Sequence, residues 1–195
     1  MASNKSSTLK TGDLIEVTIE KVAHGGHFIA RHEGAVIFVR HAIPGERCTI
    51  EVTSTGSSFN RADVIEVHEK SEHRVDAPCK FAHRSGCGGC DFQHINPEFQ
   101  RVLKSDVIKE QFFRIAKMQV EVQVEEVSKS THWRTRAIAT TNRNGKLGFY
   151  KSRSHTVVQV DDCLICVEGM KLKEIAASHL KGDMRIEVSA SNTGE

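Results

Sequence analysis

The chain has 195 residues, a formal net charge of +2 at pH 7, 38% hydrophobic residues and 27% charged residues. This length accommodates one large or two small domains, and the composition is that of a soluble globular protein. Residues 1–8 are polar and predict a flexible tail without the apolar core of a secretory signal, and no apolar run is long enough to cross a membrane. We therefore expect a cytoplasmic protein with no membrane partner, in which the six cysteines are reduced and indicate a metal site rather than disulfides.

Residues 9–68 consist of short runs in which apolar and polar residues alternate, separated by turns that are rich in glycine. Ile15, Val17 and Ile19 show the alternation of a half-buried strand. Five such runs predict a small closed β-barrel that is similar in size to an OB fold. Cys48 occupies an apolar position in one of these runs, so we expect it to be buried.

Residues 69–78 form a charged connector that ends in proline. A helix is predicted further along the chain, after the loop at residues 79–94. Asn96 and Pro97 have the N-cap and first-turn positions of this helix, which we expect to reach about Lys117. Its apolar residues drift around the helix axis instead of holding one stripe. We therefore expect the helix to be bent or to be buried on more than one side.

The C-terminal part of the sequence predicts a partial α+β domain over residues 79–195. Val120, Val122 and Val124 alternate as in a strand, and Asn144-Gly145 is typical of a type I′ hairpin turn. The other expected elements are strands at 136–142, 146–150 and 156–160, a helix at 166–181 and a last strand that begins at Ile186.

Three cysteines lie within twelve residues, at Cys79, Cys87 and Cys90, in a loop that spans residues 79–94. Glycines beside the last two permit unusual backbone conformations and close approach. Such a loop can wrap several thiolates around one inorganic centre, but a tetrahedral or cubane centre needs a fourth ligand. The candidates for this ligand are Cys163 and Cys166.

Two inorganic centres fit the cysteine spacing. A [4Fe-4S] cluster would use Cys79, Cys87, Cys90 and one of the remote cysteines. A zinc ribbon would instead pair Cys87 and Cys90 with Cys163 and Cys166, but it leaves Cys79 unused and separates the two pairs by more than the usual distance. In the third alternative, all of the cysteines remain free thiols.

Residues 127–160 contain no Asp or Glu, although charges are mixed in the rest of the chain. We call residues 129–155 the basic segment; Trp133, Phe149 and Tyr150 are interleaved with its cations. Cations neutralise phosphates and rings stack on unpaired bases, so the basic segment predicts an RNA interface. The alternative is a solvated hairpin whose rings face the core. The candidate RNA-binding residues are Arg134, Arg136, Lys146, Phe149, Lys151, Arg153 and His155.

Several motifs resemble a known family. Residues 12–68 are similar to a TRAM domain, notably in AHGG at 23–26 and PGER at 44–47. Residues 86–94, GCGGCDFQH, resemble the iron–sulfur signature of the TRAM-containing RNA (uracil-5-)-methyltransferases. Further similarities to that family's central domain are WRTR at 133–136, GFYK at 148–151 and DCLI at 162–165.

The resemblance implies a [4Fe-4S] cluster whose fourth ligand is Cys163, and a barrel and central domain that grip a structured ribosomal or transfer RNA. It also implies that a C-terminal Rossmann-like domain binds S-adenosylmethionine, where a cysteine attacks uracil C6 and a glutamate acts as base. No glycine-rich loop of such a domain follows Ser189, and no cysteine follows Cys166. We therefore expect that this chain contains no catalytic residue and that a separate domain carries out methylation. The chain would then be one piece of a split enzyme that is completed in trans, a truncated gene product, or a fragment.

Two further functions are compatible with the sequence. One is a stand-alone TRAM module that binds RNA and holds zinc or an iron–sulfur cluster. The other is a small iron–sulfur electron carrier, which would need neither a barrel nor a basic segment.

Overall fold

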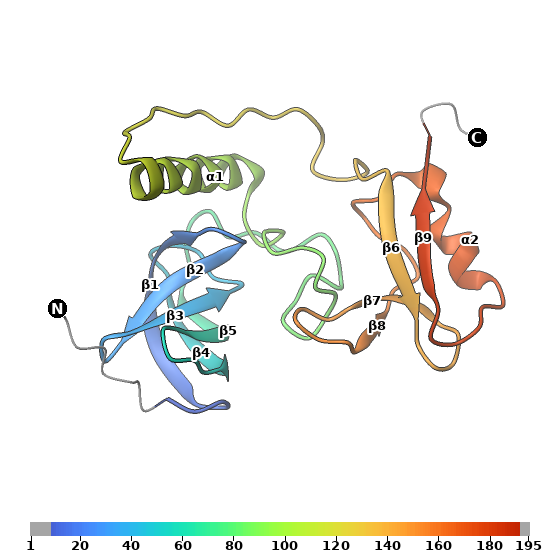
Figure 1. The fold of residues 1–195 in the computed structure, drawn as a ribbon, viewed down its shortest axis with the longest axis horizontal. Coiled ribbons are helices and arrows are strands. Elements are labelled where there is room, and N and C mark those ends of the chain that lie inside the picture. The colour runs from blue at the N-terminus through green and yellow to red at the C-terminus, as the bar shows by residue number, and fades with distance from the viewer. Residues whose placement is uncertain (1–8, 192–195) are drawn as a thin grey trace. The chain divides into compact units, whose positions relative to one another are not determined.

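A computed structural model describes residues 9–191 (Figure 1). The predicted tail at residues 1–8 lies outside the described residues. The chain divides into two compact units. The barrel unit comprises the residues up to Asp76 together with Asp91–Glu125, and the cysteine unit comprises Ala77–Cys90 and the residues from Glu126 onward. The sequence prediction placed residues 91–125 in the second domain, whereas the structure groups them with the barrel. No helix in the described residues has the length and apolar character needed to span a membrane.

The barrel unit contains a closed barrel with the strand order β1-β2-β3-β5-β4, which confirms the five-stranded barrel expected from the sequence (Figure 1). The strands are β1 (Leu14–Ala23), β2 (His27–His32), β3 (Ala35–Arg40), β4 (Arg47–Ser54) and β5 (Asn60–Glu69). Antiparallel pairing of β1 with β4 closes the barrel, and β3 pairs with β5 in parallel. A closed barrel leaves no unpaired strand edge, so its outer face is defined by the alternation of side chains alone.

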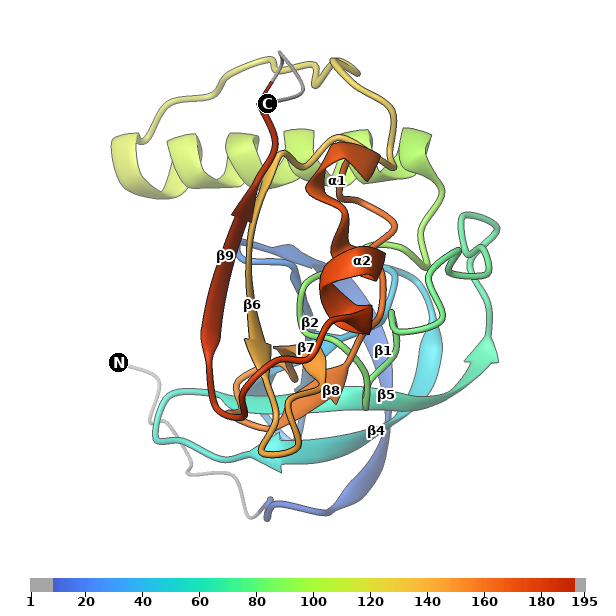
Figure 2. The same ribbon diagram turned by 90° about the vertical axis from the view of Figure 1, so that its right-hand side faces the viewer.

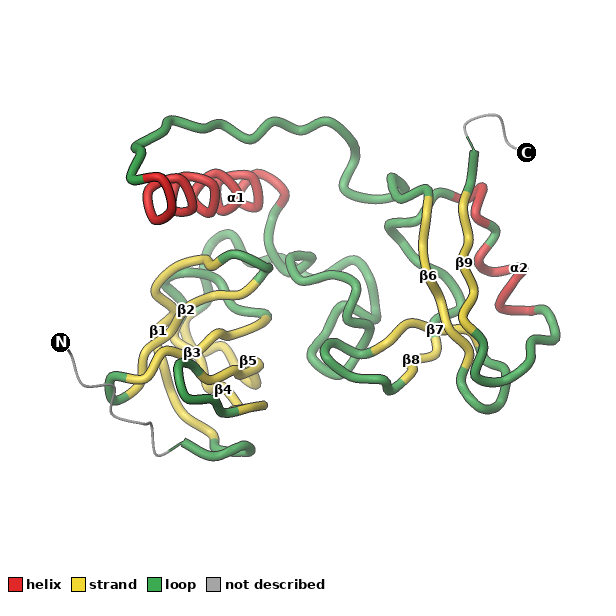
Figure 3. The backbone as a smooth tube through the Cα atoms, viewed as in Figure 1, coloured by secondary structure: helices red, strands yellow, loops and turns green. Residues whose placement is uncertain are grey.

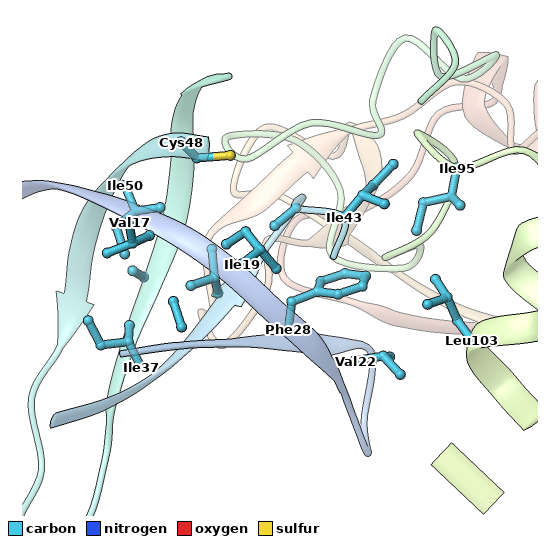
Figure 4. Close-up of a cluster of buried hydrophobic side chains, with 14 residues drawn as sticks. Val17, Ile19, Val22, Phe28, Ile37, Ile43, Cys48, Ile50, Ile95 and Leu103 are labelled. Carbon is cyan, nitrogen blue, oxygen red and sulfur yellow. The ribbon is translucent and has the colours of Figure 1, made fainter. Parts of the chain in front are cut away.

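The barrel core consists of the inward-facing side chains of these strands (Figure 4). Phe28 and Ile37 have no exposed surface, and Ile95 and Leu103 extend the same apolar cluster beyond the strands. Cys48 lies on β4 in this cluster, as the sequence predicts, and burial raises the pKa of its thiol to about 12. At neutral pH this thiol is therefore protonated and packs as a small apolar side chain.

A buried ion pair ties the connector to the barrel. Glu46 has no exposed surface, and the Arg74 guanidinium donates to both of its carboxylate oxygens at 2.6 and 2.7 Å. The backbone N–H groups of Ile43 and Ser71 donate to the same carboxylate at 2.9 and 3.2 Å. The buried charge is thus both paired and fully hydrogen-bonded, which is the condition under which such a pair is tolerated.

The helix α1 (Pro97–Gln111) begins where the sequence predicts, because the Asn96 side chain accepts a hydrogen bond from the Phe99 N–H at 2.8 Å. A π-helical turn, η1 (Phe112–Ala116), continues it and ends at Lys117, whose φ is +57°. The expectation of burial on more than one side is wrong. In α1 only Leu103 and Ser105 are buried, and large apolar side chains stay exposed at Val102, Phe112, Phe113, Ile115 and Met118.

The strand predicted at Val120, Val122 and Val124 is absent from the described structure. The segment after η1 is a loop as far as β6 (Figure 3). Its Val124 N–H donates to the Ser105 hydroxyl at 3.2 Å instead of to a neighbouring strand. Alternation alone predicted the strand, but a strand also requires a pairing partner, which this segment lacks.

The cysteine unit contains a four-stranded sheet with the order β8-β7-β6-β9. Its strands are β6 (Arg136–Thr141), β7 (Leu147–Tyr150), β8 (Val157–Gln159) and β9 (Arg185–Ser189). The last strand of the chain therefore returns to pair with β6, as both ribbon views show (Figures 1 and 2). This non-local pairing makes β6 an inner strand.

Two local predictions in the cysteine unit need correction. The turn between β6 and β7 is not type I′, because only Gly145 has a positive φ. Its three-residue loop is closed by the Asn142 N–H, which donates to the Lys146 carbonyl at 3.0 Å, while the Asn142 side chain accepts from the Asn144 and Lys146 N–H groups. The helix expected over 166–181 is reduced to the 3-10 turn η2 (Glu168–Met170) and the short α2 (Leu172–Ala177).

Candidate cysteine site and nucleic-acid interface

The cysteine loop is held by successive turns of its own backbone. The Ala82 N–H donates to the Cys79 carbonyl at 2.9 Å, and the Cys87 N–H donates to the Phe81 carbonyl at 3.0 Å. A Cβ atom on Gly86 would lie 2.1 Å from the same Phe81 oxygen. Only glycine fits at this position, which explains part of the glycine-rich sequence of the loop.

The loop is also attached to the end of the β7 hairpin. Cys87 forms an isolated antiparallel bridge with Lys151, and the Gly88 N–H donates to the Tyr150 carbonyl at 3.0 Å. A Cβ atom on Gly88 would lie 2.5 Å from the Ser152 nitrogen. The loop and the basic segment, which are far apart in sequence, are therefore in direct backbone contact.

The four cysteines predicted as ligands are electrostatic neighbours in this unit. Burial raises the pKa of the Cys87 thiol, and the nearby Cys90, Cys163 and Cys79 thiols raise it further. The Gly89 N–H donates a hydrogen bond to the Cys87 sulfur at 3.3 Å, which lowers this pKa. Each of these thiols disfavours a second negative charge beside it. An arrangement of this kind lowers the cost of binding a cation that neutralises them.

The two remote cysteines have different environments. Cys163 is half-buried, whereas Cys166 is only 4% exposed and belongs to the apolar core of the cysteine unit. A hydrogen bond between the two thiols lowers the pKa of Cys163 to about 6 and raises that of Cys166, and the Arg134 guanidinium also lowers both values. The Cys163 thiol is among the neighbours that raise the pKa of Cys87.

The four cysteine thiolates have the chemistry of ligands for a soft metal centre. Four cysteine thiolates suit a [4Fe-4S] cluster or a zinc ion. Within residues 9–191, however, no three or more His, Cys, Asp or Glu side chains are arranged as a metal-binding group. The structure thus brings the four predicted thiols into one neighbourhood without forming a closed ligand cage.

The predicted RNA-binding residues fall into two groups. Arg136, Lys146, Arg153 and His155 are exposed; Arg134, Phe149 and Lys151 are half-buried. Arg136 forms an ion pair with Glu187 on β9, so part of its charge is compensated. The Arg134 guanidinium lies over the Trp133 ring, 5.2 Å from its centroid. The cations that remain most accessible for phosphates are therefore those near the β6–β7 turn and in the loop after β7.

The rings of the basic segment differ in exposure. Phe149 packs against the core of the cysteine unit, whereas Tyr150 and Trp133 are 48% and 46% exposed. The Tyr150 ring makes an edge contact with the His155 ring, with 5.7 Å between their centroids. Successive residues of a strand face opposite sides, so only one ring of the Phe149-Tyr150 pair can face solvent, and that ring belongs to Tyr150.

Sequence reasoning missed two features of this surface. The exposed ring of Tyr150 could have been inferred from its alternation with a buried Phe149, given the correct register. Glu187 could not, because β9 reaches β6 through a long-range pairing that has no local signal. The basic segment is free of acidic residues in sequence, but it is not free of them in space.

Comparison with known proteins identifies the barrel first. The TRAM domain family matches residues 9–65, which include most of the barrel. It is 40% identical over 195 residues to an uncharacterized RNA methyltransferase of Streptomyces coelicolor, with 92% of this chain and 43% of that protein covered. It is 35% identical to an uncharacterized RNA methyltransferase of Bdellovibrio bacteriovorus, with 94% and 48% covered. Both relatives are named as RNA methyltransferases, and the similarity extends over most of this chain but less than half of each of theirs.

A solved structure supports the same fold. The tRNA (uracil-54, C5)-methyltransferase of Pyrococcus abyssi, solved with S-adenosyl-L-homocysteine, superposes with a TM-score of 0.52 at 19% identity, covering 81% of this chain and 34% of that chain. At this identity the likeness concerns the fold alone. The chain spans less than half the length of these relatives.

Proposed function

We propose that this chain is the RNA-binding and cluster-carrying part of an RNA (uracil-5-)-methyltransferase that acts on ribosomal or transfer RNA. The observation that carries the proposal is the combination of exposed rings and exposed cations on one segment of the cysteine unit. Trp133 and Tyr150 supply the rings, and Lys146 and Arg153 supply the cations. Such a combination is typical of sites that bind unpaired RNA, since rings stack on bases while cations neutralise phosphates. Relatives named as RNA methyltransferases support it.

The exposure of the side chains in the structure alters which residues we propose to contact RNA. Tyr150 replaces Phe149 as the stacking ring of the hairpin, because Phe149 packs against the core. Lys146, Lys151, Arg153 and His155 are retained as contacts to phosphate. Arg136 contributes less, since Glu187 competes for its guanidinium.

The second part of the proposal concerns the inorganic centre. Cys79, Cys87, Cys90 and Cys163 would hold a [4Fe-4S] cluster, with zinc as the alternative. The bound cluster would supply a redox-active cross-link between the cysteine loop and the segment before η2. The neighbouring thiols and the half-buried position of Cys163 support this assignment. The chain's own contribution is the loop, which its glycines and its contact with the hairpin keep compact.

The third part concerns catalysis, for which we place the S-adenosylmethionine site and the nucleophilic cysteine in a domain outside these 195 residues. Curated relatives are about twice as long as this chain, which leaves room for such a domain. Five large apolar side chains are exposed along α1 and η1 and just after it. An apolar surface of this kind is typical of a face that another domain covers. The isolated chain should accordingly transfer no methyl group from labelled S-adenosylmethionine to RNA, and measurable transfer would refute this part.

RNA binding can be tested with the whole chain and a labelled single-stranded RNA at several salt concentrations. Lys146→Ala with Arg153→Ala should weaken binding and lower the slope of log affinity against log salt by roughly 0.7 for each lost phosphate contact. Tyr150→Ala should weaken binding by about 1–3 kcal/mol without changing this slope, because stacking releases no counterions. Lys104→Ala, which removes an exposed lysine of α1, is the matched control. Equal affinity for all of these variants, with the fold intact, would contradict the proposal.

A further inference from the structure

Two cysteines lie at the two ends of a single backbone turn. The Cys166 N–H donates to the Cys163 carbonyl at 2.9 Å, which closes a β-turn over Leu164 and Ile165. The Cα atoms at the ends of such a turn are less than about 7 Å apart, and a disulfide joins residues whose Cα atoms are roughly 4.4–6.8 Å apart. The two thiols are also in hydrogen-bond contact with each other. The backbone therefore places both thiols within reach of a disulfide.

The turn is held in place by the segment before β6. The Leu164 carbonyl accepts a hydrogen bond from the His132 N–H at 3.0 Å. The Ile165 carbonyl accepts from the N–H groups of Trp133 and Arg134 at 2.9 and 2.8 Å. Because these hydrogen bonds already fix the backbone of the turn, a bond between the two sulfurs would order little additional chain.

The proposed metal centre uses only one of these two thiols. It takes Cys163, which is half-buried and which a small oxidant can reach. Cys166 is 4% exposed, but it lines a cavity of about 270 Å³ beside His132 and Lys171, which gives a small reductant a path to it. The turn thus combines an accessible thiol with a second thiol beside it, and this arrangement is typical of cysteines that are oxidised reversibly.

We propose that Cys163 and Cys166 form a disulfide on reaction with a peroxide when no metal centre holds Cys163. The inference goes beyond the proposed function, because the disulfide itself requires neither RNA nor a particular metal. Only its competition with a metal centre rests on the proposed ligand set.

The reaction balances with hydrogen peroxide as the oxidant. The Cys163 sulfur attacks one peroxide oxygen, the O–O bond breaks, and Cys163 becomes a sulfenic acid while one water leaves. The Cys166 sulfur then attacks the Cys163 sulfur, the S–O bond breaks and a second water leaves. Each sulfur gives up one electron in total, the two peroxide oxygens are reduced, and the two thiol protons end in the two waters.

The disulfide protects Cys163 from irreversible oxidation. A sulfenic acid that has no thiol beside it proceeds to a sulfinic acid, which thiols do not reduce, whereas a disulfide is reopened by thiol exchange. A Cys163 sulfur that is bonded to Cys166 also has no thiolate to offer to iron or zinc. Oxidation of this pair and metal binding at Cys163 therefore exclude each other.

The test uses the whole chain, freed of metal by a chelator in the presence of dithiothreitol, separated from both reagents and exposed to hydrogen peroxide. Remaining thiols are blocked with N-ethylmaleimide before digestion with trypsin. Cys163 and Cys166 lie together in the tryptic peptide of residues 154–171, which contains no other cysteine. This peptide should lose both maleimide labels and become lighter by two hydrogen atoms than the reduced, unlabelled peptide. Dithiothreitol should restore both labels.

Two variants show whether the second thiol is responsible. In Cys166→Ala, peroxide should add two oxygen atoms to Cys163, and dithiothreitol should not remove them. Cys48→Ala is the matched control, because Cys48 is buried in the barrel core, and this variant should form the disulfide as the unaltered chain does. Retention of both labels in the unaltered chain, or a disulfide from either residue to any other cysteine, would overturn the inference.

Zinc uptake separates this inference from the proposed metal site. The oxidised chain should bind less Zn²⁺ than the reduced chain, and dithiothreitol should restore the uptake. If the disulfide forms and zinc uptake is unchanged, the pair is supported and the assignment of Cys163 as a ligand is overturned. If the reduced chain binds metal but no disulfide forms, the pair is overturned and the ligand set stands.

Discussion

The Gly88 N–H donates a hydrogen bond to the Tyr150 carbonyl at 3.0 Å, which joins the cysteine loop to the residue that bears the exposed ring of the basic segment. The neighbouring residues Cys87 and Lys151 form a backbone bridge in the same place. Any centre bound by the loop would therefore act on the conformation of the hairpin end. Binding of metal and binding of RNA are expected to be coupled through this contact.

We predict that Gly88→Ala separates the cysteine loop from the hairpin. The new Cβ would lie 2.5 Å from the Ser152 nitrogen and 2.7 Å from its Cα, so the backbone must shift, at a cost of roughly 1–3 kcal/mol. Urea unfolding followed by the fluorescence of Trp133, the single tryptophan, measures this loss. RNA affinity should fall with it, because Tyr150 moves.

Gly169→Ala provides the matched control for this change. Its Cβ would lie 3.5 Å from the Ala190 Cβ, which is an ordinary contact in the same unit. It should leave both the unfolding midpoint and the RNA affinity close to those of the unaltered chain. Equal effects of the two glycine changes would show that the loop–hairpin contact has no special role.

The fourth ligand can be identified by comparing Cys163→Ser with Cys166→Ala. Chain purified without oxygen should be brown and contain equal amounts of iron and acid-labile sulfide. Cys163→Ser should lose the colour and the iron, since a hydroxyl is a poor ligand for this centre. Cys166→Ala should keep them, because Cys166 packs in the core. A colourless chain that contains stoichiometric zinc would favour the zinc ribbon. Loss of iron in Cys166→Ala but not in Cys163→Ser would identify Cys166 as the fourth ligand.

The sequence predicted the barrel well because its signals are local. Alternation at β1 and the glycine-containing turns together specify short strands that can only bury their apolar side by closing. The start of α1 was predictable for the same reason, since Asn96 and Pro97 act within one turn. The missing strand at Val120 shows the limit of this reasoning, because alternation does not reveal whether a pairing partner exists.

The candidate site was predictable in residue type but not in geometry. Spacing gave three thiols and two candidates for the fourth, between which the family resemblance selected Cys163. The environments of Cys163 and Cys166 differ only in the folded unit. The exposed ring of the hairpin depends on register, which exchanged Phe149 for Tyr150. The ion pair between Arg136 and Glu187 depends on the β6–β9 pairing, which is a long-range feature.

Arg74→Ala should destabilise the barrel unit strongly. It would leave the Glu46 carboxylate buried without its partner, and loss of one member of such a pair costs about 3–5 kcal/mol. Arg47→Ala is the control, because Arg47 forms ion pairs with Glu16 and Glu69 at the exposed surface, where such pairs contribute little. Urea unfolding followed by circular dichroism should show a large shift for the first variant and almost none for the second. Similar shifts for both would contradict the importance of burial.

The environment of His94 predicts that the barrel unit loses stability in mild acid. Burial lowers the pKa of this imidazole, and the Ala42 carbonyl, which accepts from its Nε2 at 2.9 Å, opposes the shift only in part. Arg74 lowers the pKa further, whereas Glu46 and Asp91 raise it. The folded chain therefore holds His94 neutral at a pH where the unfolded chain protonates it.

The sign of the effect follows from this difference. In the unfolded chain the imidazole has a pKa of about 6.5, and in the folded chain its pKa is lower. Between these two pKa values the unfolded state binds more protons than the folded state. The free energy of unfolding therefore decreases as the pH falls through this window. In His94→Gln the amide can still donate to the Ala42 carbonyl but binds no proton. This variant should lose less stability than the unaltered chain between pH 7 and pH 5, measured by thermal unfolding. His24→Gln, at an exposed position, should keep the pH dependence of the unaltered chain, and an identical pH dependence in all three chains would show that His94 does not cause it.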